Sequence, residues 1–176
     1  MMEYFLLQSS VTVPFRPIMF DQTAVPYTMT EENYRKLPDS NSFYYHIKED
    51  EEIPELLVKP TFLCGEELKH IMEVYDPTVR WKSIYIMPDQ EEQVVEGTRH
   101  YWIPDLMKQK CVHKDCRIMP NGSIEHLILD QQRLRNLDLF QVDGLVENKV
   151  VVSLQLAESI SRRHMYGVSL ERVEVR

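Results

Sequence analysis

The C-terminal segment, residues 150–175, constrains the fold more than any other part of the chain. Its run Val150–Val152 is typical of a short buried strand, and Ser153 is placed to cap a following helix. Helical spacing puts four residues on one face of that helix: Leu156, Ala157, Ile160 and His164. Gly167 predicts a left-handed end of the helix, and Val168–Val175 a closing strand. The segment therefore predicts a strand–helix–strand unit.

A second unit with the same plan precedes it in the chain. Thr61–Leu63 predicts a short strand, Glu66–Val74 a helix, and Trp81–Met87 a strand of β-branched and aromatic residues. Asp76-Pro77 ends the helix, because proline disfavours helical geometry in the residue before it. Two apolar pairs correspond at a constant separation, Leu68 with Ala157 and Ile71 with Ile160. The two segments thus form a weak internal repeat of pattern.

Between the two units the sequence predicts antiparallel strands. His100–Ile103 and Leu139–Val142 are strand candidates, and Pro120-Asn121-Gly122 is a strong hairpin signal between residues 116–119 and 123–129. These elements predict an α+β fold with a mixed, mainly antiparallel β-sheet and two or more packed helices. In it, two strand–helix–strand units are joined by a hairpin section.

Length and patterning predict one domain over residues 1–176. Residues 1–57 are rich in proline and tyrosine, and we expect them to form an irregular part that wraps the core over residues 58–176. Strand candidates within this N-terminal part are Tyr4–Gln8, Val11–Phe15 and Phe43–Ile47.

Composition limits the classes of function. A hydrophobic fraction of 43% is sufficient for a sizeable core, and no apolar run approaches the ~20 residues that span a bilayer. The formal net charge of −8 argues against direct binding of nucleic acid, which needs clustered lysine and arginine. Three cysteines without a secretory signal favour reduced thiols and a cytoplasmic location.

The acidic residues are concentrated in two short segments. One contains Glu49, Asp50, Glu51 and Glu52, and the other contains Asp89, Glu91 and Glu92. Both lie beside prolines between apolar segments, which predicts loops. Such loops serve solubility, or they bind a basic protein partner through complementary charge.

The residue types that could take part in catalysis or metal binding form no convincing active site. Cys111, His113 and Cys116 are ligand types for zinc, but their spacing lacks a Cys-x₂-Cys knuckle and a defined fourth ligand. Cys64 precedes a helix N-terminus, where a thiolate is stabilised, but a nucleophile also needs a nearby base. No glycine-rich phosphate loop, His-Glu-x-x-His motif or Gly-x-Ser-x-Gly elbow occurs. We therefore expect no enzyme, no metal and no cofactor.

The C-terminal pattern also resembles a known family. Val150–Ser153, Leu156–Arg163 and Gly167-Val168 resemble the closing motif of a bacterial immunity-protein family of polymorphic toxin systems, of the type of immunity families eleven and forty-three. The strand–helix entry Lys59–Cys64, the turn and strand Asn121–Asp130, and Phe140–Val142 resemble earlier parts of that family. The resemblance covers residues 58–176.

The resemblance implies a small cytoplasmic protein that binds a cognate toxin and blocks it. It transfers no binding residue, so the acidic segments are our hypothesis for the contact, and a basic toxin such as a nuclease suits them. The alternative is a small-molecule sensor or scaffold domain, with a pocket lined by Tyr101, Trp102 and Cys111. The sequence does not determine an oligomeric state.

Overall fold

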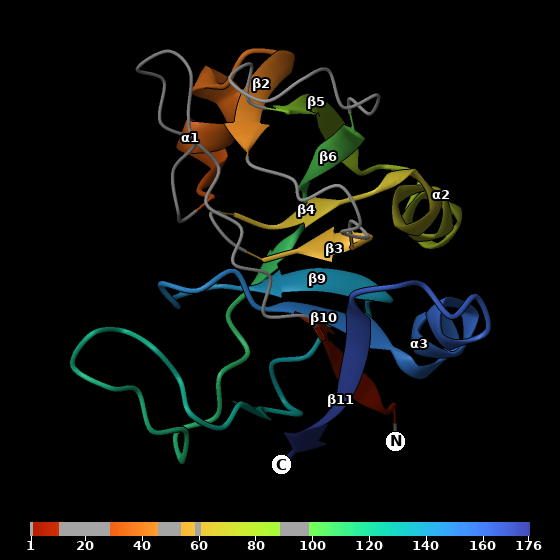
Figure 1. Ribbon diagram of the computed structural model, residues 1–176. Helices are drawn as coiled ribbons and strands as arrows, with labels where there is room; N and C mark the ends of the chain where they lie inside the picture. Colours follow the sequence, from red (N-terminus) through yellow and green to blue (C-terminus); the bar gives the residue numbers. More distant parts are fainter. Residues whose placement is uncertain (1, 11–28, 46–53, 59–60, 89–98) are drawn as a thin grey trace.

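A computed structural model describes residues 2–10, 29–45, 54–58, 61–88 and 99–176 of this chain (Figure 1). These residues form three helices, α1 (Glu31–Lys36), α2 (Glu66–Tyr75) and α3 (Leu154–Ser161). Their strands are β1 (Tyr4–Ser9), β2 (Ser40–Tyr45), β3 (Leu56–Leu57), β4 (Leu63–Cys64), β5 (Arg80–Pro88), β6 (Arg99–Asp105), β7 (Lys108–Gln109), β8 (Ile128–Leu129), β9 (Leu139–Val142), β10 (Val150–Ser153) and β11 (Val168–Val175). The predicted α+β class with mixed strands and packed helices is confirmed.

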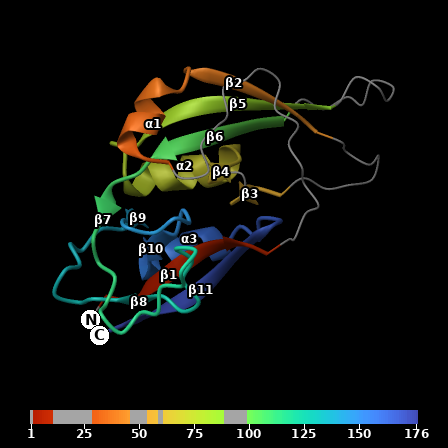
Figure 2. The same cartoon turned by 90° about the vertical axis from the view of Figure 1, so that its left-hand side faces the viewer.

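The strands form two sheets where the sequence suggested one. One sheet has the order β2-β5-β6-β4-β3, and the other has the order β7-β9-β10-β1-β11-β8. Most neighbouring strands are antiparallel, and the parallel pairs are β2 with β5, β11 with β8 and β7 with β9. Figure 2 shows the two sheets as separate layers, one above the other.

The two sheets repeat the same topology. The order β2-β5-β6-β4-β3 corresponds to β8-β11-β1-β10-β9, and each pair of neighbours has the same relative direction in both sheets. Helix α2 connects β4 to β5 as α3 connects β10 to β11. The pattern repeat seen in the sequence therefore reflects two structural copies of a five-stranded unit.

The copies differ in how the chain supplies one strand. In the first unit β6 follows β5 along the chain, whereas in the second the equivalent strand is β1, at the opposite end of the sequence from β11. Because β1 and β11 are antiparallel and Tyr4 pairs with Val173, the two chain ends lie close together (Figure 2). The second unit thus has the strand order of the first, but no chain connection joins β11 to β1 as one joins β5 to β6.

Helices α2 and α3 pack against the sheets and share one core. Helices α2 and α3 contact each other, and they lie on the same side in Figure 1. Their buried residues Leu68, Met72, Leu156 and Ile160 belong to a single apolar cluster that also includes residues of both sheets, among them Cys64 and Val152. Burial of this continuous cluster is the main force that holds the two units together.

Helix α3 begins where the sequence predicted. The Ser153 hydroxyl accepts a hydrogen bond from the Leu156 amide at 3.4 Å and donates one to Asp138 at 2.6 Å. Helix α2 has Gly65 at the corresponding position and no side-chain cap of its own. Glu158 and Arg162 form an ion pair on the surface of α3, at 3.4 Å.

The end of α3 differs from the prediction. The helix stops at Ser161, so His164 does not share the apolar face of Leu156 and Ile160. His164 is exposed and adopts a left-handed conformation with φ 49°, three residues before Gly167, whose φ is 80°. Two left-handed residues therefore turn the chain from α3 into β11, and Gly167 stands at the start of the strand.

The predicted hairpin at Asn121-Gly122 is reduced to a tight turn. Gly122 has φ 78°, and its amide donates to the Met119 carbonyl at 2.8 Å. Only one bridge, Ile118 with Ile124, continues beyond the turn, and Ile128–Leu129 pairs instead with β11 as β8. Burial of Ile128 and Leu129 in the core explains the different pairing.

The N-terminal part is more regular than expected. Residues 1–57 include β1, which lies inside the six-stranded sheet between β10 and β11, as well as α1, β2 and β3. Its fully buried Tyr4 packs edge-on against Phe140, with ring centroids 5.6 Å apart. The strand candidate Val11–Phe15 lies outside the described residues. Within the described residues, no helix is long and apolar enough to cross a membrane.

Candidate functional site: an aromatic strip on the first sheet

A strip of aromatic side chains lies on the face of the first sheet that α2 partly covers. Because side chains alternate along a strand, Trp81 and Tyr85 of β5 share this face, as do His100 and Trp102 of β6. The register places Tyr85 opposite His100, and Ser83 opposite Trp102. We call Trp81, Tyr85, His100 and Trp102 the aromatic strip.

The rings of the strip contact one another across the two strands. Tyr85 and His100 are stacked, with centroids 4.6 Å apart and planes that differ by 2°. His100 and Trp102 follow at 4.3 Å with planes tilted by 44°. Tyr85 is 38% exposed, and the other three residues are partly buried. The strip therefore runs from α2 out to the solvent at Tyr85.

The end of the strip beside α2 holds a cation of the protein itself. The Lys69 ammonium lies 4.6 Å from the ring centroid of Trp102 and 5.5 Å from that of Trp81. It also pairs with Glu73 at 2.9 Å. The Trp102 indole donates to Glu66 at 2.6 Å. Cation–π attraction and these charged contacts fix the covered end of the strip.

Two polar atoms of the strip have no hydrogen-bond partner among the described residues. They are the buried Nε1 of Trp81 and the buried Nε2 of His100. Buried polar atoms are normally paired, so unpaired ones mark places where stability is not optimised. Both atoms belong to rings of the aromatic strip itself.

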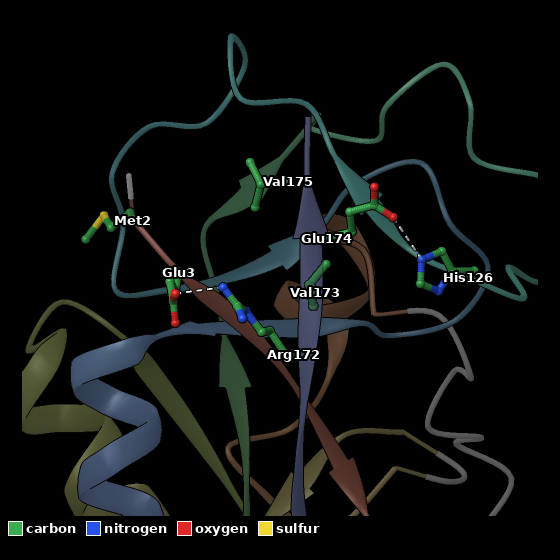
Figure 3. Close-up of a pocket in the computed structure, with 7 residues that line it drawn as sticks. All are labelled: Met2, Glu3, His126, Arg172, Val173, Glu174 and Val175. Carbon is green, nitrogen blue, oxygen red and sulfur yellow. Dashed lines mark hydrogen bonds and ion pairs between the residues drawn. The ribbon is translucent and has the colours of Figure 1, made fainter.

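The equivalent place on the second sheet is a cleft of about 410 Å³ (Figure 3). It is lined by Met2, Glu3, His126, Arg172, Val173, Glu174 and Val175. Figure 3 shows Arg172 pointing toward Glu3, at 2.7 Å, and Glu174 pointing toward His126, at 3.4 Å. The same position of the repeated unit is therefore ionic in the second copy and aromatic in the first.

The charges of this cleft neutralise one another. Hydrogen bonds from Arg176 and His126 hold the pKa of Glu174 below its ordinary value. Arg176 also contacts Asp115 at 3.1 Å, and Asp115 lies 3.5 Å from His113. Because each charged group here already has a partner, the cleft offers no unpaired charge for a ligand.

The acidic residues proposed as the contact, Glu49, Asp50, Glu51, Glu52, Asp89, Glu91 and Glu92, lie outside the described residues. The structure does place the strands from which their segments start. Strands β2 and β5 are parallel neighbours, and Tyr45 at the end of β2 pairs with Pro88 at the end of β5. The chain therefore leaves β2 and β5 toward the two acidic segments at the same end of these strands, which we call the acidic edge of the first sheet. Pro88, the last residue of β5, is three residues beyond Tyr85.

Two of the three cysteines, Cys64 and Cys111, are buried in the core. Cys64 is fully buried, and burial raises the pKa of its thiol well above the ordinary value, with the nearby Glu55 carboxylate as a second cause. Burial likewise raises the pKa of Cys111 to about 12. The stabilisation expected for Cys64 beside a helix N-terminus is thus outweighed by the loss of solvent. Both shifts disfavour the thiolate form.

The candidate zinc residues do not converge. Cys116 exchanges hydrogen bonds with the backbone of Ile128 at 3.1 and 3.0 Å, and Cys111 contacts the Gln109 carbonyl at 3.4 Å. His113 is engaged with Asp115. No group of three possible metal ligands occurs in the described part of the chain.

The small-molecule pocket suggested by the sequence is not formed. Tyr101 and Trp102 are adjacent on β6 and point to opposite faces of the sheet, so they cannot line one cavity. The Tyr101 hydroxyl is buried and donates to the Pro54 carbonyl. Cys111 belongs to the core of the second sheet. The three residues have separate structural roles.

The aromatic strip is the feature that sequence reasoning missed. Trp81, Tyr85 and Trp102 were recognisable as residues of a sheet face, and alternation within β5 relates Trp81 to Tyr85. Alternation within β6 relates His100 to Trp102 in the same way, but the stack of His100 on Tyr85 depends on the register between β5 and β6, which no local pattern specifies.

No model of a known protein family matches this chain, and no curated protein matches it. The resemblance to immunity proteins therefore rests on the residues of the chain alone.

Proposed function

We propose that this chain is an immunity protein that binds a cognate bacterial toxin and neutralises it by direct contact, without catalysis, in the cytoplasm. The contact surface is the edge of the first sheet where β2 and β5 end. The toxin is basic, as a nuclease is, and its positive surface is the part that this edge binds.

The placement of negative charge is the observation that carries the proposal. The segments 46–53 and 89–98 contain eight carboxylates and one lysine, and thus seven of the eight net negative charges of the chain. They start from the paired strand ends Tyr45 and Pro88. A single-sign field of this kind accelerates encounter with a partner of opposite charge and disfavours wrong partners.

The rest of the described structure agrees with a binding role. The thiols Cys64 and Cys111 are buried, which favours their protonated forms, and the charged residues of the cleft beside β11 are paired with one another. The resemblance of residues 58–176 to an immunity family points to the same class of function.

The test co-expresses the chain with toxin-like products of genes next to its own and measures growth. Rescue of growth, together with a stoichiometric complex on size-exclusion chromatography, is the expected result. If no such product is toxic, or if the chain rescues none of them, the immunity proposal is wrong.

Charge reversal tests the contact edge. The variant Glu51→Lys/Glu91→Lys should weaken toxin binding about tenfold or more and reduce its dependence on salt. The matched control is Glu125→Lys/Glu171→Lys, which gives the same net charge from exposed residues on the second unit. Equal affinity of the two variants would show that the total charge, and not this edge, governs binding.

A further inference from the structure

We propose that Asn121 is a site of spontaneous covalent modification, at which the side-chain amide is converted to a carboxylate through a cyclic imide formed with Gly122. The closed turn that contains both residues controls the rate of this reaction. The inference does not rest on the proposed function, because it follows from the chemistry and the hydrogen bonds of the turn alone.

The reaction needs a backbone nitrogen that can reach the side-chain carbonyl carbon of the preceding asparagine. The Gly122 nitrogen attacks Cγ of Asn121, and the side-chain nitrogen leaves as ammonia, which carries away the proton that Gly122 loses. Water then opens the cyclic imide at either carbonyl, so the product is aspartate or isoaspartate. Glycine favours the ring closure because it has no Cβ and its backbone rotates more freely than that of other residues.

The sequence directs the reaction to this one position. Asn121 is the only asparagine of the chain that precedes glycine, since Asn33, Asn41, Asn136 and Asn148 precede tyrosine, serine, leucine and lysine. The side chains of those four following residues hinder the approach of the backbone nitrogen. Asn121 is also exposed, so water has access to the imide.

The closed turn holds both reacting groups away from each other. The Gly122 amide donates to the Met119 carbonyl at 2.8 Å, so its proton points toward Met119. The Oδ1 of Asn121 accepts from the Ser123 amide at 3.0 Å and from the Ser123 hydroxyl at 2.7 Å. Ring closure needs the Gly122 nitrogen to turn toward Cγ of Asn121, and these bonds oppose that rotation. The reaction therefore proceeds from an open form of the turn.

The turn can open without unfolding the core. Both Met119 and Asn121 are exposed, and a single bridge, Ile118 with Ile124, continues the pairing beyond the turn. Exposed segments with few buried contacts open locally at a much lower free energy than the whole domain unfolds. The native protein therefore samples the reactive form.

The product fits the closed turn less well than asparagine does. Isoaspartate adds a methylene to the backbone next to Gly122, which adopts a left-handed conformation with φ 78°. A β-carbon on Gly122 would lie 2.3 Å from Cγ2 of Val146, so the turn already packs closely against this side chain. Both products also add a negative charge. We expect the modified turn to stay open more often than the original one.

The experiment incubates the full chain in mildly alkaline buffer, with and without urea, and follows conversion at each asparagine by peptide mass spectrometry. Ser123→Ala removes the hydroxyl that bonds to Asn121 and keeps the backbone amide. Ser161→Ala, at an exposed serine in the other half of the second unit, is the matched control. Asn121→Gln lengthens the side chain, which disfavours the ring, and identifies the signal from this position.

We expect conversion at Asn121 before any other asparagine, and a higher rate in urea than in native buffer. Ser123→Ala should raise the native rate about 2- to 10-fold, the range expected for the loss of one hydrogen bond, and leave the rate in urea unchanged. Ser161→Ala should match the wild type in both conditions. Melting temperatures show whether the serine variants keep the fold.

Three results would overturn the inference. If Asn121 stays intact in native buffer while it reacts in urea, the folded protein has no such site. Equal rates of the wild type in the two conditions would mean that the turn does not control the reaction, and this comparison needs no variant to fold. If Ser123→Ala reacts more slowly than the wild type in native buffer, the hydroxyl activates the Asn121 carbonyl, and the restraining role assigned to the turn is wrong.

Discussion

Glu55, a half-buried glutamate, links the two units. Its amide donates to the Tyr166 carbonyl and its carbonyl accepts from the Gly65 amide, both at 2.8 Å. Its side chain lies at the N-terminus of α2, where the amides of Leu68 and Glu67 stabilise the charged form. It takes the place of the side-chain cap that Gly65 does not provide.

The charge of Glu55 is nevertheless unfavourable in the folded protein. Burial is the largest influence and raises its pKa, helped by the nearby carboxylates of Glu67 and Glu66, against the opposing effect of the amides. One oxygen, Oε2, is buried without a hydrogen-bond partner among the described residues. Loss of solvent therefore outweighs the attraction of the helix N-terminus.

The first prediction follows from the sign of this shift. A folded-state pKa above the ordinary 4.5 means that the folded protein binds this proton more tightly than the unfolded chain. The stabilisation is present below pH 4.5 and is lost as the pH rises through the raised pKa. Glu55→Gln keeps an acceptor for the helix without the charge, so it should increase the free energy of unfolding at pH 7.

The measurement is urea unfolding of Glu55→Gln and wild type between pH 3.5 and 8. The gain should disappear as the pH falls below 4.5, where the wild-type carboxyl is also neutral. Glu125→Gln, at an exposed site, should change stability by less than about 0.5 kcal/mol at every pH. A difference for Glu55→Gln that does not vary with pH would contradict the assigned cause.

At the scale of elements, the connection from α3 to β11 depends on Gly167. Its φ of 80° is in the left-handed region, and a β-carbon placed there would lie 2.9 Å from the Cα of Pro54. Its carbonyl accepts from the Ser10 amide at 3.0 Å, so the backbone cannot move away without losing this bond. Gly144 has a similar φ of 86° but open space around it.

The second prediction compares these two glycines. Gly144→Ala adds only the strain of a left-handed alanine and should cost about 1 kcal/mol. Gly167→Ala adds a collision with the backbone of Pro54 and should cost about 2 to 4 kcal/mol. Urea midpoints of the two variants measure the difference. Equal losses would mean that the approach of Pro54 is not tight in solution.

Local patterns predicted the longer elements well. The apolar spacing placed α2 at Glu66–Val74, one residue short of its end, and the strand Leu139–Val142 has the predicted bounds. The bounds of two-residue strands were less predictable, because the extent of such a strand is set by the strand beside it. The strand predicted at Thr61–Leu63 overlaps β4 only at Leu63. The same limit hid the aromatic strip, since the stack of Tyr85 on His100 depends on a register.

At the scale of the whole molecule, the duplication explains the position of the chain ends. In the first unit a direct connection joins β5 to β6, and in the second the equivalent strands β11 and β1 are the two ends of the sequence. The sequence showed the repeat only in the two strand–helix–strand units, because β1 had no partner within its own half of the chain. By pairing with both β10 and β11, β1 joins these two strands into one sheet.

The third prediction is that the protein tolerates circular permutation. A short glycine-rich linker from Arg176 to Met1 would join the adjacent ends of β11 and β1, and new ends would be opened between Glu92 and Gln93. The permuted chain supplies β6 from its start, as the natural chain supplies β1. It should fold cooperatively, with a free energy of unfolding within about 2 kcal/mol of the wild type, since ends placed in connecting segments are generally tolerated.

Circular dichroism and urea unfolding of the permuted chain test the equivalence of the two units. A chain opened between Ile71 and Met72, inside α2 and its buried face, is the control and should fail to fold. If the two units are equivalent, β6 should pair with β5 without a chain connection, as β1 pairs with β11. Opening the β5–β6 connection should then lower the free energy of unfolding only slightly. A second control attaches the same linker to the end of the natural chain without permutation. If this control is stable and the permuted chain is unfolded, the β5–β6 connection is needed for folding and the two units are not equivalent in this respect.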